Sequence, residues 1–128
     1  MPLHKIDHIT LNSSDLAKTC AFYGDALGFD VQLKEGRGQK GAWLSLDGHP
    51  CVHVMSRAPE QSPGIRGQMD HFAIEATGLA EIRRRLGRAG LAFRENPIPE
   101  MDLHQLILRD PDGVKVELNF RGFAAREG

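Results

Sequence analysis

The fold is decided by a stretch of sequence that occurs twice. Residues 7–16 read Asp-His-Ile-Thr-Leu-Asn-Ser-Ser-Asp-Leu, and residues 70–79 read Asp-His-Phe-Ala-Ile-Glu-Ala-Thr-Gly-Leu. In both copies apolar and polar residues alternate as in a half-buried strand, and a Ser, Asp or Thr able to cap a helix follows. Each copy therefore predicts a strand that leads into a helix.

The correspondence extends beyond these two stretches. An offset of 63 residues pairs Asp7 with Asp70, Leu16 with Leu79 and Asp47 with Asp110, and after one added residue Val52-His53-Val54 matches Val116-Glu117-Leu118. A period of this length indicates a duplicated structural module, and each half-buried face would need cover from the other half.

The elements of each module follow from periodicity and turn residues. In the first half we expect strands at 5–12, 29–35, 42–46 and 51–56, with a helix from Leu16 to Leu27 that ends at Gly28. In the second half we expect strands at 69–75, 91–95, 103–109 and 114–120, with a helix capped by Thr77. Asp110-Pro111-Asp112-Gly113 is a strong turn signal between the last two strands. The sequence thus predicts an α+β fold in one domain, 1–128, built from two βαβββ modules at 1–57 and 69–128 with a linker at 58–68.

Composition excludes several classes of partner. The chain has 128 residues, with 16 Lys and Arg against 17 Asp and Glu, so we expect it to bind no nucleic acid. It has no long apolar run, so we expect no membrane segment and no secretion signal, and we expect a cytoplasmic protein. Cys20 and Cys51 are too few for a disulfide framework.

Four polar residues stand in the middle of otherwise apolar strands: His8, His71, His53 and Glu117. We expect each to be partly buried, which requires a polar partner or a metal. One interpretation makes the three histidines satisfied core residues and turns Glu117 outward. Their equivalent placement in the two halves favours the other, in which two imidazoles and a carboxylate hold one divalent metal ion. The expected ligands are His8, His71 and Glu117, and His53 is either a further ligand or a group that transfers protons.

A few further residues are candidates for a substrate pocket. Thr10 shares the strand face of His8. If the face of His104, Leu106 and Leu108 packs under the helix, then Gln105, Ile107 and Arg109 look into the pocket. His4 and His49 are expected at the surface, and Trp43 in the core or the pocket wall.

At this point the motifs resemble a known family. The start Ile-Asp-His-Ile-Thr-Leu-Asn, the later Met-Asp-His-Phe and the ending Arg-Asp-Pro-Asp-Gly-Val-Lys-Val-Glu-Leu are similar to the vicinal oxygen chelate superfamily, which includes glyoxalase I, extradiol dioxygenases and the fosfomycin- and bleomycin-resistance proteins. The resemblance implies an eight-stranded, incompletely closed cup around one divalent ion such as Fe, Ni, Zn or Mn. It assigns His8, His71 and Glu117 as ligands. His53 departs from the pattern. At this position glyoxalase I has a carboxylate ligand, and methylmalonyl-CoA epimerase, another member of the superfamily, has a glutamine.

The expected function is a metal-dependent enzyme acting on a small, oxygen-rich substrate that chelates the metal. Its catalytic residues would be His53 and Glu117, and the reaction either a lyase or isomerase reaction or a ring-cleaving dioxygenation. The alternative is a non-catalytic protein that sequesters a small molecule or drug. The resemblance also implies a homodimer, in which each site takes His8 and His53 from one chain and His71 and Glu117 from the other.

Overall fold

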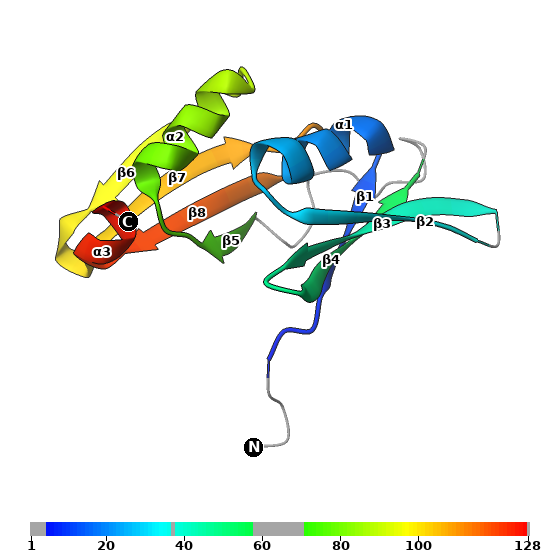
Figure 1. The fold of residues 1–128 in the computed structure, drawn as a ribbon, viewed down its shortest axis with the longest axis horizontal. Coiled ribbons are helices and arrows are strands. Elements are labelled where there is room, and N and C mark those ends of the chain that lie inside the picture. Colours follow the sequence, from blue (N-terminus) through cyan, green and yellow to red (C-terminus); the bar gives the residue numbers. More distant parts are fainter. Residues whose placement is uncertain (1–4, 37, 58–70, 128) are drawn as a thin grey trace. The chain divides into compact units, whose positions relative to one another are not determined.

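A computed structural model describes residues 5–36, 38–57 and 71–127 of the chain. The chain divides into two compact units, Met1–Gly64 and Ile65–Gly128 (Figure 1). The expected linker at 58–68 and His4 lie outside the described residues. None of the helices in the described segments has the length and apolar character that crossing a membrane requires.

The first unit is a βαβββ module. Its elements are β1 (Ile9–Ser13), α1 (Leu16–Cys20), the π-helical turn η1 (Ala21–Ala26), β2 (Asp30–Gly36), β3 (Gln39–Leu46) and β4 (His49–Ser56). They form a four-stranded sheet in the order β1-β4-β3-β2, in which β1 and β4 run parallel and the other neighbours antiparallel.

The second unit repeats this plan. Its elements are β5 (His71–Glu75), α2 (Leu79–Arg88), β6 (Arg94–Ile98), the 3-10 turn η3 (Pro99–Met101), β7 (Leu103–Arg109), β8 (Lys115–Arg121) and α3 (Gly122–Glu127). The sheet order is β5-β8-β7-β6, again with one parallel pair, β5 and β8. The predicted α+β fold of two βαβββ modules is confirmed.

Strand registers match between the two units around the centre of each sheet. Thr10 pairs with His53 across β1 and β4, and Ala73 pairs with Glu117 across β5 and β8. His53 and Glu117 therefore occupy the same place in their respective sheets, as the offset in the sequence predicts.

One face of each sheet forms the core under the helices. In the first unit Leu11, Leu44, Val52 and Val54 are buried together with Phe22 and Tyr23, and a 2.6 Å hydrogen bond joins the Ser13 and Thr19 hydroxyls of β1 and α1. In the second unit Leu106, Leu108, Val116, Leu118 and Phe120 are buried with Leu79 and Leu86 of α2. Because side chains alternate along a strand, the intervening residues lie on the opposite face.

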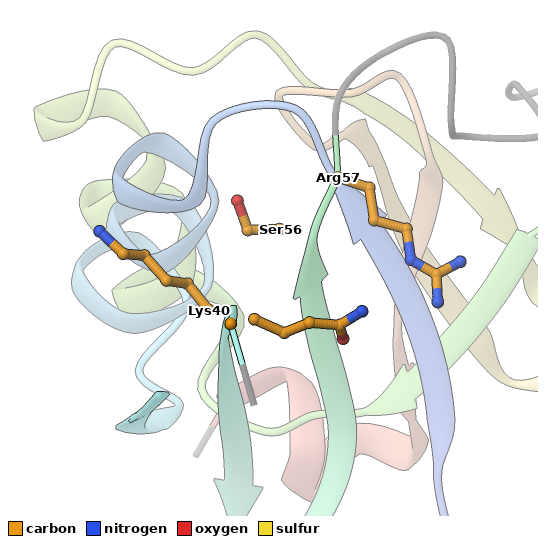
Figure 2. A pocket seen from close by; sticks show the side chains of 5 residues that line it. Lys40, Ser56 and Arg57 are labelled. Carbon is orange, nitrogen blue, oxygen red and sulfur yellow. The ribbon is translucent and has the colours of Figure 1, made fainter. Parts of the chain in front are cut away.

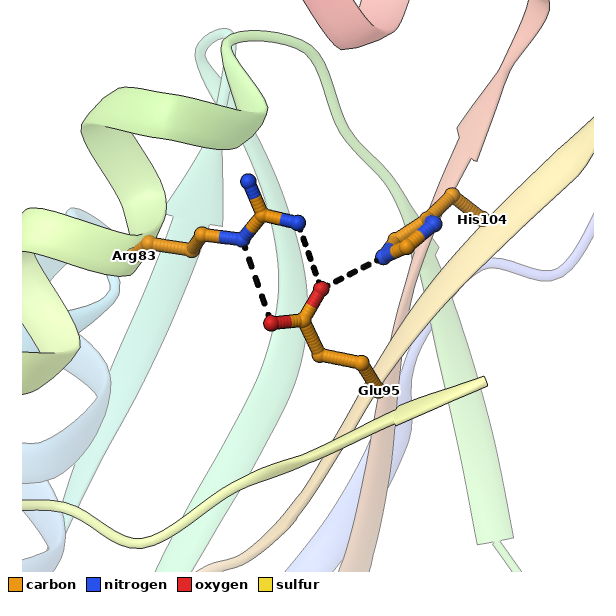
Figure 3. Close-up of polar contacts among 3 residues, drawn as sticks. All are labelled: Arg83, Glu95 and His104. Atoms are coloured by element: carbon orange, nitrogen blue, oxygen red, sulfur yellow. Dashed lines mark hydrogen bonds and ion pairs between the residues drawn. The ribbon is translucent and has the colours of Figure 1, made fainter. Parts of the chain in front are cut away.

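An ion-pair cluster anchors α2 to its sheet. Arg83 of α2 donates two hydrogen bonds, 3.2 and 2.6 Å long, to the two carboxylate oxygens of Glu95 in β6. His104 of β7 lies 2.7 Å from the same carboxylate (Figure 3). Since Glu95 pairs with Leu106, the cluster identifies the face of Leu106 as the one that α2 covers.

Several predicted boundaries were wrong. The first strand begins at Ile9, so His8 lies just before it. The third strand begins at Gln39, because it pairs with β2 as far as Gly36. The fourth begins at His49, because a two-residue Asp47-Gly48 turn with positive φ places it directly against Leu46. The first helix continues as a π-helix, where the Leu27 amide donates to the Phe22 carbonyl at 3.2 Å. The sixth strand starts at Arg94 rather than residue 91, and η3 and α3 were not predicted.

The predicted turn before β8 is confirmed. The buried carboxylate of Asp110 accepts hydrogen bonds of 2.9 Å from the amides of Asp112 and Val114, and Gly113 has φ 87°. An aspartate that accepts from its own turn is a standard solution for this kind of loop. It holds the start of β8, the strand that carries Glu117.

Candidate functional site

In the second unit a polar cluster lies on the sheet face opposite α2. Glu117 of β8 shares this face with Ile107 of β7, its cross-strand partner, and with Ala73 of β5. Its carboxylate is buried, with 8% of the residue exposed, and its Oε2 lies 3.2 Å from Nε2 of His71. Burying a carboxylate is costly unless charge or hydrogen bonds compensate it, and His71 supplies one such partner.

The second carboxylate oxygen of Glu117 is held by Gln105. The Gln105 side-chain amide donates to Glu117 Oε1 at 2.9 Å and to Asn119 Oδ1 at 3.0 Å. Its own carbonyl oxygen accepts from Asn96 Nδ2 at 2.8 Å. Glu117 therefore has one oxygen fixed by the sheet and the other beside His71.

In the first unit the equivalent position is taken by His53. It lies between Thr10 of β1 and Trp43 of β3 in the strand register. The rings of Trp43 and His53 are stacked, with centroids 4.5 Å apart and planes at 10°. The rings of His8 and Trp43 form a T-shaped contact, with centroids 5.0 Å apart and planes at 75°.

Burial lowers the pKa of His53 from its ordinary value, and the charge of His8 adds a smaller effect in the same direction. Both favour the neutral imidazole, since desolvation and a neighbouring cation disfavour a second positive charge. His53 is thus a proton acceptor near neutral pH.

His8 is oriented by the residue before it. Its Nδ1 lies 2.7 Å from Oδ2 of Asp7, and this hydrogen bond is the main cause that lowers the pKa of the Asp7 carboxyl. A carboxylate accepts only, so Nδ1 carries a proton, and in the neutral ring Nε2 keeps its lone pair. The backbone carbonyl of Asp7 in turn accepts a 2.9 Å hydrogen bond from Nε2 of His49.

The expected burial of the four polar residues holds only in part. Glu117 is buried and His53 half-buried, but His8 and His71 are exposed, with 38% and 36% of their side chains accessible. For His8 the reason is position: it precedes β1 and does not lie in the middle of that strand as expected. His71 is the first described residue of β5.

The pocket candidates are distributed as follows. Thr10 lies next to His53, Gln105 contacts Glu117, and Ile107 lies opposite Glu117. Arg109 instead donates to the Gly113 carbonyl at 3.1 Å, at the end of the sheet. Sequence reasoning missed Asn96, Asn119 and Asp7, although the first two are polar residues that alternate with apolar ones on strands.

The donors present suit a divalent metal. Imidazole nitrogen and carboxylate oxygen are the ligand types that iron, zinc, nickel and manganese share, and hydrogen bonds orient both Glu117 and His8 from behind, as is usual for ligating residues. Within either unit, however, the described His, Cys, Asp and Glu side chains form no group of three or more that could hold a metal ion.

Two hollows lie at the hairpin end of the first sheet. One, of about 310 Å³, is bordered by His53, Met55, Gly41 and the chain around Glu35. The other, of about 570 Å³, is lined by Gly38, Gln39, Lys40, Ser56 and Arg57. Figure 2 shows the cationic ends of Lys40 and Arg57 on opposite sides of this second hollow, so they do not converge on one anion.

Comparison with known proteins finds a matching family model over residues 5–118, that of the Glyoxalase/Bleomycin resistance protein/Dioxygenase superfamily. The chain is 29% identical to the virulence protein STM3117 of Salmonella typhimurium, over 93% of this chain and 85% of that protein. It is 28% identical to the glutathione transferase FosA of Serratia marcescens, over 97% and 86%.

Among solved structures, a glyoxylase/bleomycin resistance protein/dioxygenase domain from Frankia sp. superposes with a TM-score of 0.76. It is 22% identical, over 91% of this chain and 97% of that one. At this identity the likeness shows the fold alone.

Proposed function

Because the chain belongs to the Glyoxalase/Bleomycin resistance protein/Dioxygenase superfamily, we propose that it is a divalent-metal-dependent enzyme acting on a small, oxygen-rich substrate. The superfamily includes metal-dependent enzymes, and the polar sheet faces of this chain have the donors that such an enzyme needs. The proposed ligands are His8, His71 and Glu117.

A single observation carries the proposal. Glu117 is buried, one of its oxygens is held by Gln105, and the other lies 3.2 Å from Nε2 of His71. A sheet face that only needed stability would be served better by apolar residues, since a buried carboxylate paired with an exposed imidazole is weak support for a fold. An imidazole and an oriented carboxylate side by side are instead the beginning of a metal centre.

His8 is the third proposed ligand because its free nitrogen is prepared for coordination. Asp7 accepts the Nδ1 proton, and a second hydrogen bond of this kind fixes the tautomer and raises the basicity of the ligating nitrogen. With two imidazoles and one carboxylate, open positions on the ion are left for the substrate.

The bound metal would supply Lewis-acid stabilisation for an oxyanion on the substrate. His53 would move the proton: it is half-buried, stacked on Trp43 and neutral near pH 7, so it accepts a proton from a substrate carbon and returns it. This favours a lyase or isomerase over a ring-cleaving dioxygenase. Glu117 would serve as a metal ligand. It would also be a second proton acceptor, which exchanges its proton with solvent.

Metal analysis tests the ligand set. We expect protein purified without chelator to bind one Fe, Ni, Zn or Mn ion per chain, and His71→Ala and Glu117→Gln to lose most of it, because each removes one of three ligands. His49→Gln is the matched control, since its ring bonds a backbone carbonyl and should leave occupancy nearly unchanged. Full occupancy in both ligand variants would contradict the proposal.

A chelating probe shows whether small-molecule binding depends on the metal, as the proposed enzyme requires, or not, as in the non-catalytic alternative. Acetohydroxamate has two adjacent oxygens and should bind only to the metal-loaded protein, and the binding should disappear with EDTA. Binding that survives metal removal would favour the alternative, a non-catalytic small-molecule binding protein. Since one relative is named a glutathione transferase, glutathione belongs in the activity screen as a co-substrate.

We also propose a homodimer in the cytoplasm. Cys20 and Cys51 are both free, and free thiols persist in reducing compartments. A shared site, with His8 and His53 from one chain and His71 and Glu117 from its partner, would explain why neither unit by itself has a complete ligand set.

A further inference from the structure

Three side-chain amides form a hydrogen-bonded row across the second sheet, and the middle one also binds Glu117. Asn96 of β6, Gln105 of β7 and Asn119 of β8 are cross-strand neighbours on the same face. The hydrogen bonds run from Asn96 Nδ2 to Gln105 Oε1 (2.8 Å), and from Gln105 Nε2 to Glu117 Oε1 (2.9 Å) and Asn119 Oδ1 (3.0 Å).

The direction of this row follows from the charge of Glu117. A carboxylate only accepts, so the nitrogen of Gln105 has to face it, and the second N–H of that nitrogen then meets the carbonyl of Asn119. The carbonyl of Gln105 consequently faces Asn96, which has to present its nitrogen. Each amide is used in one orientation only, and exchanging N and O in any of them leaves a mismatched contact.

The row is confined to the second unit. The register places Gly41 and Met55 of the first sheet where Gln105 and Asn119 lie in the second, and His53 stands at the position of Glu117. Neither glycine nor methionine donates a side-chain hydrogen bond. A feature needed only for sheet stability would be expected in both copies, whereas this one accompanies the carboxylate.

We infer that Gln105, supported by Asn96, is a positioning residue for the metal centre proposed above: it holds Oε1 of Glu117 and leaves Oε2 as a single coordinating oxygen next to His71. The inference rests on the proposed function. Glu117 and Asn119 are buried, at 8% and 7% exposure, so these hydrogen bonds compete little with water. Without them only the contact with His71 would restrain the carboxylate, and either oxygen, or both, could approach a metal.

Substitution of Gln105 tests this directly. Gln105→Met keeps the length of the side chain and removes the donor. We expect it to weaken the affinity for Co²⁺ by about 10- to 100-fold, the range for losing a hydrogen-bond partner of a ligand. The visible spectrum of bound Co²⁺ should also change, because a carboxylate that coordinates through both oxygens alters the geometry of the ion. Asn96→Leu should act in the same direction with a smaller effect, since it leaves the Gln105 to Glu117 bond in place.

His104→Gln is the matched control. His104 neighbours Gln105 on β7, but its side chain lies on the opposite face, against Glu95. The substitution should perturb the strand without changing Co²⁺ affinity or spectrum. Thermal unfolding of each variant separates lost ligand orientation from lost folding, and if Gln105→Met does not fold, Asn96→Leu carries the test.

The outcomes distinguish the two proposals. If wild-type protein binds Co²⁺, Glu117→Gln abolishes binding and a folded Gln105→Met binds with wild-type affinity and spectrum, the positioning role is overturned while the metal centre stands. If wild-type protein binds no divalent metal under any condition, the proposed function fails and this inference fails with it. Reduced affinity in Gln105→Met alone, with an altered spectrum, supports the inference.

Discussion

At the scale of single residues, each polar side chain of the candidate site is held by a contact with a supporting residue. His8 is held by Asp7, Glu117 by Gln105 and His53 by the face of Trp43. Each supporting contact fixes a tautomer, an oxygen or a charge state, and each comes from a residue with no chemical role of its own. Changing the supporting residue should therefore alter a measurable property of its neighbour while leaving that neighbour in place.

The first prediction concerns His53. Its pKa is lowered mainly by burial and less by the charge of His8. Trp43→Ala should therefore raise the His53 pKa toward its ordinary value of about 6.5, and His8→Ala should raise it less. NMR titration of the His53 ring in metal-free protein measures both, and a larger rise in His8→Ala than in Trp43→Ala would contradict burial as the main cause.

The lowered His53 pKa also determines the direction in which the free energy of unfolding changes with pH. A depressed pKa in the folded state means that the unfolded chain binds the proton more readily. The contribution is thus present above the unfolded pKa of about 6.5 and is lost as the pH falls through the lower, folded value. In metal-free protein, His53→Gln should flatten the decline in unfolding free energy between roughly pH 7 and pH 5; an unchanged pH profile in this variant would count against the assignment.

A further prediction concerns Asp7, which accepts the Nδ1 proton of His8 at 2.7 Å. Asp7→Ala should weaken Zn²⁺ affinity by about 10-fold or more, because His8 loses its tautomer preference and orientation. Competition with a chromophoric chelator measures this. Asp15→Ala is the control: Asp15 caps α1 by accepting from the Lys18 amide at 3.1 Å, so its loss should lower stability and leave Zn²⁺ affinity unchanged.

At the scale of elements, close strand contacts and ion pairs decide how well each sheet is held. Gly41 of β3 pairs with Met55 of β4, and a Cβ at this position would overlap the Val54 carbonyl oxygen. Gly36, at the end of β2, has no atom within 4 Å of the place a Cβ would take. The two glycines thus form a natural comparison within one hairpin.

Gly41→Ala should destabilise the protein by about 1–3 kcal/mol, because backbone has to move to admit the methyl group. Gly36→Ala should be within about 0.5 kcal/mol of wild type, as for an exposed position without special contacts. Urea unfolding of both variants gives the comparison. Equal stabilities would show that the β3 and β4 backbones separate without loss.

The ion-pair cluster between α2 and its sheet makes a prediction about acid. The hydrogen bond from Arg83 is the largest cause that lowers the Glu95 pKa, and the contact with His104 adds to it. A folded pKa below the unfolded one gives stability that is present above about pH 4.5 and lost as the pH falls through the folded value. Glu95 is 37% exposed, so solvent screening keeps the effect small, at most about 1 kcal/mol.

Glu95→Gln should therefore lower the unfolding free energy at pH 7, and the difference from wild type should shrink near pH 3. Glu81→Gln is the control, since Glu81 pairs with Arg84 of the same helix and links no second element. Denaturant unfolding at the two pH values checks this. A difference that grows toward acid pH would contradict the sign.

At the scale of the whole molecule, the proposed metal ligands are divided between the two units, and this division bears on how the protein assembles. His8 and His53 belong to the first unit and His71 and Glu117 to the second. The proposed metal centre therefore would need one first unit and one second unit, either from the same chain or from two chains. We propose two chains, and mixing of inactive variants decides between these arrangements.

His8→Ala and His71→Ala chains should each bind little metal. When they are unfolded together and refolded as a mixture, about half of the dimers are mixed, and one of the two sites in each mixed dimer has both histidines. Metal binding should return to on the order of a quarter of the wild-type capacity. No recovery in mixed dimers isolated by differential tagging would place both histidines of each site in one chain, without affecting the ligand assignment.

Much of the fold could be predicted from local pattern. The alternation around His8 and His71 and the Asp110 turn depend only on neighbouring residues and on the strand period. The offset between the halves shows that the pattern occurs twice, so together these features predict two βαβββ modules. Strand ends were less predictable: pairing with β2 extends the start of β3 to Gln39, and the Asp47-Gly48 turn extends the start of β4 to His49, which a single segment does not reveal.

The candidate site divides in the same way. The polar residues that interrupt a regular apolar alternation could be found without the structure: His8, His53, His71 and Glu117. The side chains that contact them follow from strand pairing, which the sequence pattern does not show. Asn96, Gln105 and Asn119 meet Glu117 because β6, β7 and β8 pair in one register, and Trp43 stacks on His53 because β3 and β4 do. Such partners are far apart in the chain, and a shift of one residue in strand register would turn each of them to the other face.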